Sequence, residues 1–234
     1  MSYRTLDAVH IIDTLRLLEQ RISERLPNSS LASVCRDLIA IAGETQQRTQ
    51  SIAKPNMALR AAIVVAVAAG VAGLVLVART VNVQMGNAEI FSVFQGVESA
   101  MNIVVLVGAA LFFLISLETR LKRRRSLRDL HAFRSIAHVI DMHQLTKDPS
   151  FVIAGAETTA SSPKRAMTIF ELTRYLDYCS EMLSLTNKLA ALYAQDLPDA
   201  VVIDVVNDIE QLTTNLSSKI WQKITILDAA RAAR

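Results

Sequence analysis

Two pairs of histidine and aspartate have a spacing that would suit metal ligands. His10 precedes Asp13, and His138 precedes Asp141, in segments with helical periodicity. Side chains three residues apart lie on one face of a helix, so two facing helices could present four ligands to one metal ion. The alternative is a local hydrogen bond or an interhelical polar contact within each pair. The spacing matches no established metal signature, and we expect no bound cofactor.

Other catalytic signatures are missing from the sequence. It contains no helical His-Glu-x-x-His, no Cys-x-x-Cys, no glycine-rich phosphate loop and no Gly-x-Ser-x-Gly. These absences argue against the common enzyme classes, and we interpret the protein as a non-enzyme. A metal-dependent membrane enzyme that uses the His/Asp pairs remains a third hypothesis. Cys35 and Cys179 fall on apolar faces, where we expect free thiols that act as small core residues.

The apolar residues are concentrated in two blocks. Of the 234 residues, 51% are hydrophobic and 20% are charged. Residues 61–78 are free of charged and polar side chains, and residues 100–117 contain only Asn102 and Ser116 as polar members. Core helices of soluble proteins are usually amphipathic, whereas a uniformly apolar run of this length suits a membrane span. The sequence therefore predicts two transmembrane helices.

The distribution of basic residues predicts the topology. The connector 80–99 has no Lys or Arg, whereas a basic cluster directly follows the second span: Arg120, Lys122, Arg123, Arg124 and Arg125. Basic residues favour the cytoplasmic side, so we expect a multi-pass protein of the cell (inner) membrane with both termini in the cytoplasm. We assign the basic cluster to anionic lipid head groups. The alternative is nucleic acid, which a net charge of +3 does not favour, and we expect no nucleic-acid partner.

A polar stripe leads into the second span. Gln95, Glu98 and Asn102 follow at helical spacing, and Phe113 lies further along the same face. Polar side chains at a membrane end could line the mouth of an oligomeric pore, with Phe113 as an apolar constriction. The alternative is an interfacial helix whose polar face contacts head groups or solvent.

Small residues recur on one face of the first span. Ala62, Ala66, Gly70 and Gly73 form the small-xxx-small pattern that allows close helix packing in lipid. Alanine and glycine are also common in spans that make no such contact. The last helical segment shows a repeat of apolar residues that resembles a coiled-coil face. Together these patterns favour a homo-oligomer.

The whole chain is predicted to be all-α, with a cytoplasmic helical bundle built from both ends of the chain. The expected organisation is as follows: a helical hairpin over 1–54, a first span over 55–79, an external loop with a short amphipathic helix over 80–99, a second span over 100–118, a cytoplasmic helical extension over 119–146, a flexible loop over 147–167 and a helical hairpin over 168–234.

Two functions fit this organisation. The first is a homo-oligomeric two-span membrane protein that forms a pore or ion channel, assembled or gated by its cytoplasmic bundle. The second is a membrane-anchored scaffold or adaptor whose bundle binds a protein partner. The pore hypothesis depends on the polar stripe and the small-residue face, whereas the adaptor hypothesis needs only the anchor and the bundle.

Overall fold

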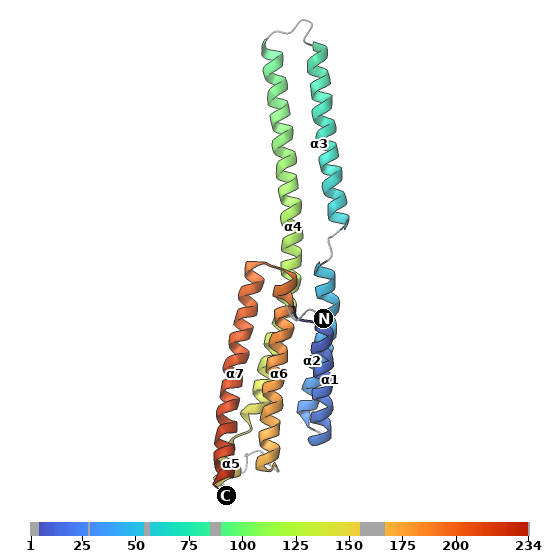
Figure 1. The fold of residues 1–234 in the computed structure, drawn as a ribbon. Coiled ribbons are helices and arrows are strands. Elements are labelled where there is room, and N and C mark those ends of the chain that lie inside the picture. Colours follow the sequence, from blue (N-terminus) through green and yellow to red (C-terminus); the bar gives the residue numbers. More distant parts are fainter. Residues whose placement is uncertain (1–4, 28, 54–56, 85–89, 155–166, 234) are drawn as a thin grey trace. The chain divides into compact units, whose positions relative to one another are not determined.

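The computed structural model describes residues 5–27, 29–53, 57–84, 90–154 and 167–233, and the regular structure in these ranges is entirely helical (Figure 1). The predicted all-α fold is therefore confirmed. The chain divides into two compact units: Met1–Ala53 with Arg125–Arg234, and Lys54–Arg124. We call the first the bundle unit and the second the hairpin unit.

The bundle unit contains helices from both ends of the chain. Its helices are α1 (Ala8–Arg25), α2 (Ser30–Ala53), α5 (Pro149–Ala154), α6 (Ile169–Asp196), α7 (Ala200–Ala232) and the C-terminal part of α4 (Ile90–Leu145). The side chain of Asp7 accepts a hydrogen bond from the Val9 amide and caps α1. The buried Cys35 thiol on α2 donates to the Leu15 carbonyl of α1 at 3.8 Å, and these two helices pack against each other as a hairpin.

Helix α6 is the central helix of the bundle unit. It packs against α1, α2, α5 and α7, and its Tyr193 ring meets Phe133 of α4 edge-on at 6.3 Å between ring centres. Side chains are buried on almost every side of α6, as the neighbouring residues Tyr178, Cys179, Met182 and Leu183 illustrate. A helix surrounded in this way contributes contacts to most of the core.

Helix α7 buries one apolar stripe in its own chain. The buried residues are Val202, Val206, Ile209, Thr213, Leu216, Ile220, Ile224 and Leu227, and the main neighbour of α7 is α6. The coiled-coil-like repeat of the sequence is therefore satisfied within one molecule. The buried stripe itself is therefore not available to a second copy.

Two helix starts have side-chain caps. Thr168 and Glu171 form a reciprocal capping box at the start of α6, as the Thr-x-x-Glu pattern predicts. The backbone amide of Thr168 donates to Glu171, which lowers the pKa of that carboxyl. Asp199 accepts from the amides of Val201 and Val202 and starts α7.

The hairpin unit contains α3 (Met57–Gln84) and the N-terminal part of α4. The short amphipathic helix expected within 80–99 is not a separate element, because α4 already begins at Ile90; residues 85–89 lie outside the described part. The segment expected as a loop over 147–167 contains α5, and its residues 155–166 also lie outside the described part.

Candidate functional site

Helix α4 carries a long apolar surface that is largely exposed, although α3 packs against it near Val107. Gly96–Leu145 is long and apolar enough to cross a membrane, and its most apolar 18-residue window has a mean hydropathy of 2.5 with none of it buried. Phe112 is 75% exposed, Leu106 69% and Val105 66%. A surface of this kind is unfavourable in water and suits lipid or neighbouring apolar helices.

Only this helix qualifies as a span among the described residues. The apolar part of α3 that meets the same composition, Ala61–Gly73, is too short by that measure. The two-span prediction is therefore not confirmed. What the described chain contains is one helix with the length and composition of a membrane span, which agrees with association with a membrane.

The expected pore-lining residues lie on α4. Glu98 and Asn102 are exposed, and Phe113 is 63% exposed; the side chain of Gln95 lies outside the described part of the structure. The helical spacing places these positions on one face. Two exposed polar side chains, Glu98 and Asn102, therefore lie near the start of α4, and the helix is mainly apolar for several turns after them.

The small residues of α3 split between packed and open positions. A Cβ at Gly70 would lie 2.7 Å from a methyl carbon of Val107, and one at Gly73 would lie 3.9 Å from Ile103. Gly70 therefore lets α3 approach α4 of the same hairpin closely. Ala66 is half-buried and Ala62 is exposed. At least the Gly70 end of this face therefore packs inside the molecule, whereas the small-xxx-small pattern predicts contact with another copy.

The basic cluster is partly paired. Lys122 forms an ion pair with Glu118 at 3.0 Å, one helical turn away. Arg120, Arg124 and Arg125 are exposed, and Arg123 is half-buried. Exposed guanidinium groups directly after an apolar helix suit anionic head groups.

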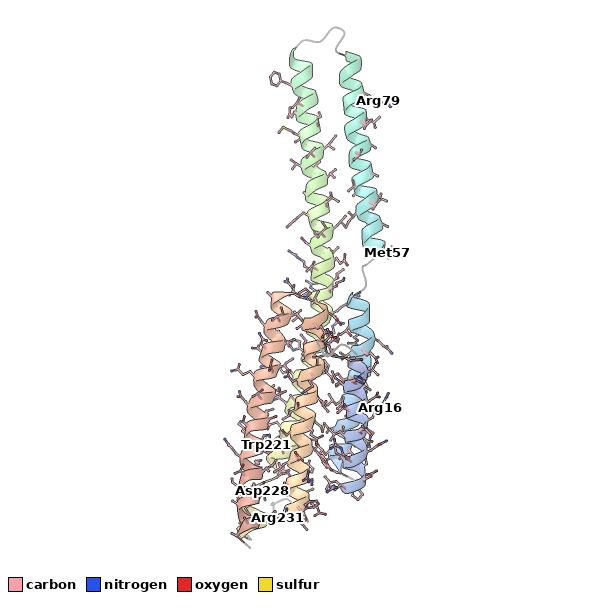
Figure 2. The ribbon with its side chains drawn as sticks, viewed as in Figure 1. Arg16, Met57, Arg79, Trp221, Asp228 and Arg231 are labelled. Atoms are coloured by element: carbon pink, nitrogen blue, oxygen red, sulfur yellow. The ribbon has the colours of Figure 1, made fainter. Side chains whose placement is uncertain are left out.

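The His/Asp pairs do not assemble into a metal site. Asp13 accepts from Arg16, which lies on the same helix α1 (Figure 2), at 3.0 Å, and Asp141 accepts from Gln144 at 2.5 Å. His10 and His138 are exposed on separate helices. No group of three or more His, Cys, Asp or Glu side chains suited to a metal occurs among the residues that the structure describes. The partner of each aspartate is thus a side chain three residues further along its own helix, Arg16 for Asp13 and Gln144 for Asp141, and not the histidine of its pair.

A buried polar contact joins three helices of the bundle unit. Asp129 of α4 is 7% exposed and accepts from the guanidinium of Arg48 on α2 and, at 3.0 Å, from the hydroxyl of Tyr193 on α6. Burial raises the pKa of Tyr193, so its hydroxyl stays protonated as the donor. The sequence signal is an acid within an apolar stripe, one residue before Leu130, and the patterns considered above do not include it.

An open hollow of about 670 Å³ lies where α1, α2 and α6 meet. The Gln195 side chain closes one wall, because it accepts from the Leu6 amide at 2.9 Å and donates to the Leu6 carbonyl at 3.4 Å. Lys188 and Asp196 line the hollow beside apolar residues such as Val9. Burial raises the pKa of Asp196 above its ordinary value. This volume is typical of small-ligand or side-chain pockets.

The two cysteines are structural. Cys35 and Cys179 are free and fully buried, and burial raises the pKa of each thiol to about 12. A protonated, inaccessible thiol is a poor nucleophile. Neither cysteine therefore suits catalysis.

Comparison of the chain with protein-family models, with curated proteins and with solved structures finds no match. The functional argument therefore rests on the geometry of the two units.

Proposed function

We propose that the protein is a multi-pass protein of the cytoplasmic membrane, in which α3 and α4 cross the bilayer as a hairpin. The exposed apolar surface of α4 is the observation that supports this proposal. Lipid would remove this surface from water without any contact from the rest of the chain. The absence of Lys and Arg from residues 80–99, against five basic residues at 120–125, supports a cytoplasmic bundle unit.

Ion conduction by a homo-oligomer is the activity that this arrangement supports best. Glu98 and Asn102 are exposed on an apolar helix. Polar side chains at membrane depth are costly unless they face water, so such positions typically line an aqueous path. A ring of Glu98 carboxylates would favour cations, and Phe113 on the same face would form an apolar constriction that gates by dewetting.

Recordings from the purified protein in planar bilayers test this activity. We expect cation-selective single-channel currents, with cation selectivity reduced in Glu98→Gln and retained in the matched control Glu98→Asp. Silence of the wild type across several ions and voltages would contradict ion conduction, while leaving membrane insertion to be judged by extraction with alkaline carbonate.

A membrane-anchored adaptor is the second candidate, and the hollow between α1, α2 and α6 favours it. Val9 lines this hollow and is 47% exposed, whereas Leu17 lies further along α1 and is 61% exposed without lining it. A photoreactive residue at position 9 should then give a discrete crosslinked protein in cells, and one at position 17 should not. Equal labelling from both positions would speak against a specific partner.

A further inference from the structure

The outward face of α4 in the bundle unit changes character along its length. Arg128, His131 and His138 are exposed, and Met142 and Leu145 continue the same side of the helix at 64% and 57% exposure. The buried residues of this part of α4, such as Phe133 and Ile140, lie on the opposite side. The face is thus basic first and apolar afterwards.

The outward face of α7 also changes along its length, from acidic residues to apolar ones. Asp204 and Asp208 are exposed near its start, and Ile226 follows on the same side at 53% exposure. This side is opposite the stripe that α7 buries in its own chain, of which Ile209 and Leu216 are members. The face is therefore acidic first and apolar afterwards.

The charges on these two faces are unpaired among the residues that the structure describes. In the part of the chain that the structure describes, neither Arg128 nor Asp204 nor Asp208 forms an ion pair. The region 120–138 of α4 contains seven Lys and Arg residues and one acid, the buried Asp129. The basic face is accordingly open to a carboxylate from outside the molecule.

A hydrogen bond sets the relative height of the two faces. Tyr193, near the end of α6, donates to Asp129 of α4. Further along the chain, Lys223 of α7 donates to Gln144, which is also further along α4. Because α7 follows α6 directly and advances along α4 in the same direction as the residue numbers, α7 is parallel to α4 and α6 is antiparallel to it. The level positions on α4 and α7 therefore differ by 79 in number. On this offset Arg128 is level with Asn207, which lies between Asp204 and Asp208.

The apolar halves also match in height. Leu145 is level with Ile224 by the same offset, and Ile226 follows two residues later, about 3 Å further along the axis. Arg128 and Leu145 are about 25 Å apart along α4, and Asp208 and Ile226 are about 27 Å apart along α7. The basic part of the α4 face is therefore level with the acidic part of the α7 face, and the two apolar parts are level with each other.

Copies inserted in one membrane share one orientation, so equal heights meet when they assemble side by side. We propose that α4 of one copy docks on α7 of the next, with Arg128 between Asp204 and Asp208 and with Met142 and Leu145 against Ile226. The inference rests on the proposed function, because membrane insertion supplies the shared orientation. Since the contact joins two different faces, it repeats from copy to copy and suits a closed ring.

A second copy fits these faces better than a polyphosphate chain does. A nucleic acid would pair with Arg128 but would leave Met142 and Leu145 exposed. Stable protein interfaces combine an apolar core with charged residues at the rim, which is the composition of the two faces together. The carboxylates at the matching height come from the chain itself.

Charge exchange on the full-length protein in detergent tests the contact, with particle mass as the readout. We expect wild type to form an oligomer, and Arg128→Asp and Asp208→Arg each to weaken assembly about tenfold. A chain that carries both changes should regain the wild-type mass, because every contact then pairs an acidic residue on α4 with a basic residue on α7. Glu210→Arg, on another exposed side of α7, is the matched control and should assemble normally.

Several outcomes would overturn the proposal. These are a monomeric wild type, an Arg128→Asp variant with wild-type mass, a doubly changed chain that does not reassemble, or an assembly that nuclease dissolves. Helical circular dichroism of each variant separates misfolding from lost docking, and the conservative Arg128→Lys should retain assembly. Failure to resist carbonate extraction would instead refute the proposed membrane function, whichever mass is observed.

Discussion

Asp129 of α4 forms hydrogen bonds with side chains of two other helices, α2 and α6. It is almost fully buried, yet it is an acid, and both Arg48 and Tyr193 donate to it. A carboxylate in such a place is tolerated only while its hydrogen bonds are made, because an unpaired buried charge is strongly unfavourable. The contact therefore specifies how α2, α4 and α6 align, more than it adds to stability.

Removing one donor from this contact should weaken the bundle unit. Tyr193→Phe deletes the hydroxyl that donates to Asp129 at 3.0 Å, and we expect a loss of about 1–2 kcal/mol in the free energy of unfolding. Thermal unfolding followed by the fluorescence of the single Trp provides the measurement. Tyr178→Phe is the control, since its ring contacts Arg21 and no hydrogen bond of its hydroxyl is recorded among the described residues. Equal losses in both variants would contradict a special role of the Asp129 contact.

The buried thiols should make the protein sensitive to alkali. Burial raises the pKa of Cys35 and Cys179 to about 12, whereas an exposed thiol ionises near pH 8.5. The two thiols therefore bind their protons more tightly in the folded state than in the unfolded state. Its stability is complete below about pH 8.5 and falls as the pH rises toward 12. Neither thiol should react with a thiol reagent at pH 8 until the protein unfolds; labelling of the native protein would contradict their burial.

At the scale of elements, the sequence predicted helices throughout, and the described part of the chain is helical. The buried residues of α1 and α6 recur at helical spacing, and Thr168 of the Thr-x-x-Glu pattern caps α6. Periodicity reports which side of a helix is apolar, but it does not report what covers that side. For this reason the sequence could not show that the repeat in α7 packs against α6, or that Gly70 packs against α4.

The close approach at Gly70 can be tested on the hairpin unit. Gly70→Ala places a methyl group 2.7 Å from a Val107 carbon, so the two helices must move apart. Cysteines introduced as Ala66→Cys and Leu111→Cys, in a chain with Cys35 and Cys179 changed to Ser, should then form a disulfide severalfold more slowly. Gly108→Ala is the control, because a Cβ at Gly108 meets nothing within 4 Å. An unchanged rate with Gly70→Ala would contradict the packing.

At the scale of the whole molecule, the proposed function depends on which apolar surfaces are exposed and which are buried. The apolar stretch of α4 is exposed in the described chain, whereas the apolar faces of α6 and α7 are buried in the bundle unit. The sequence predicted both kinds of surface from composition. It could not identify the hollow between α1, α2 and α6 or the matched heights of α4 and α7, because both depend on which helices are neighbours.

The proposed topology can be tested with single cysteines in a chain that lacks the native pair. A membrane-impermeant maleimide added to intact cells should label Asn87→Cys, which lies in the segment free of Lys and Arg. Ser218→Cys on α7 should react only after the membrane is opened. Labelling of position 218 in intact cells would place the bundle unit outside and contradict the orientation.

The central position of α6 also constrains how the chain is made. The helices α1, α2 and α4, together with the hairpin unit, all leave the ribosome before α6, the helix around which the bundle is built. Synthesis of the stretch from Ala53 to Ile169 takes about 6–23 s at 5–20 residues per second. During that interval the apolar sides of α1 and α2 have no central partner, while the apolar part of α4 is already available for insertion. On the proposed function, membrane insertion should thus precede completion of the bundle, and a chain stopped before α6 should be inserted but rapidly degraded.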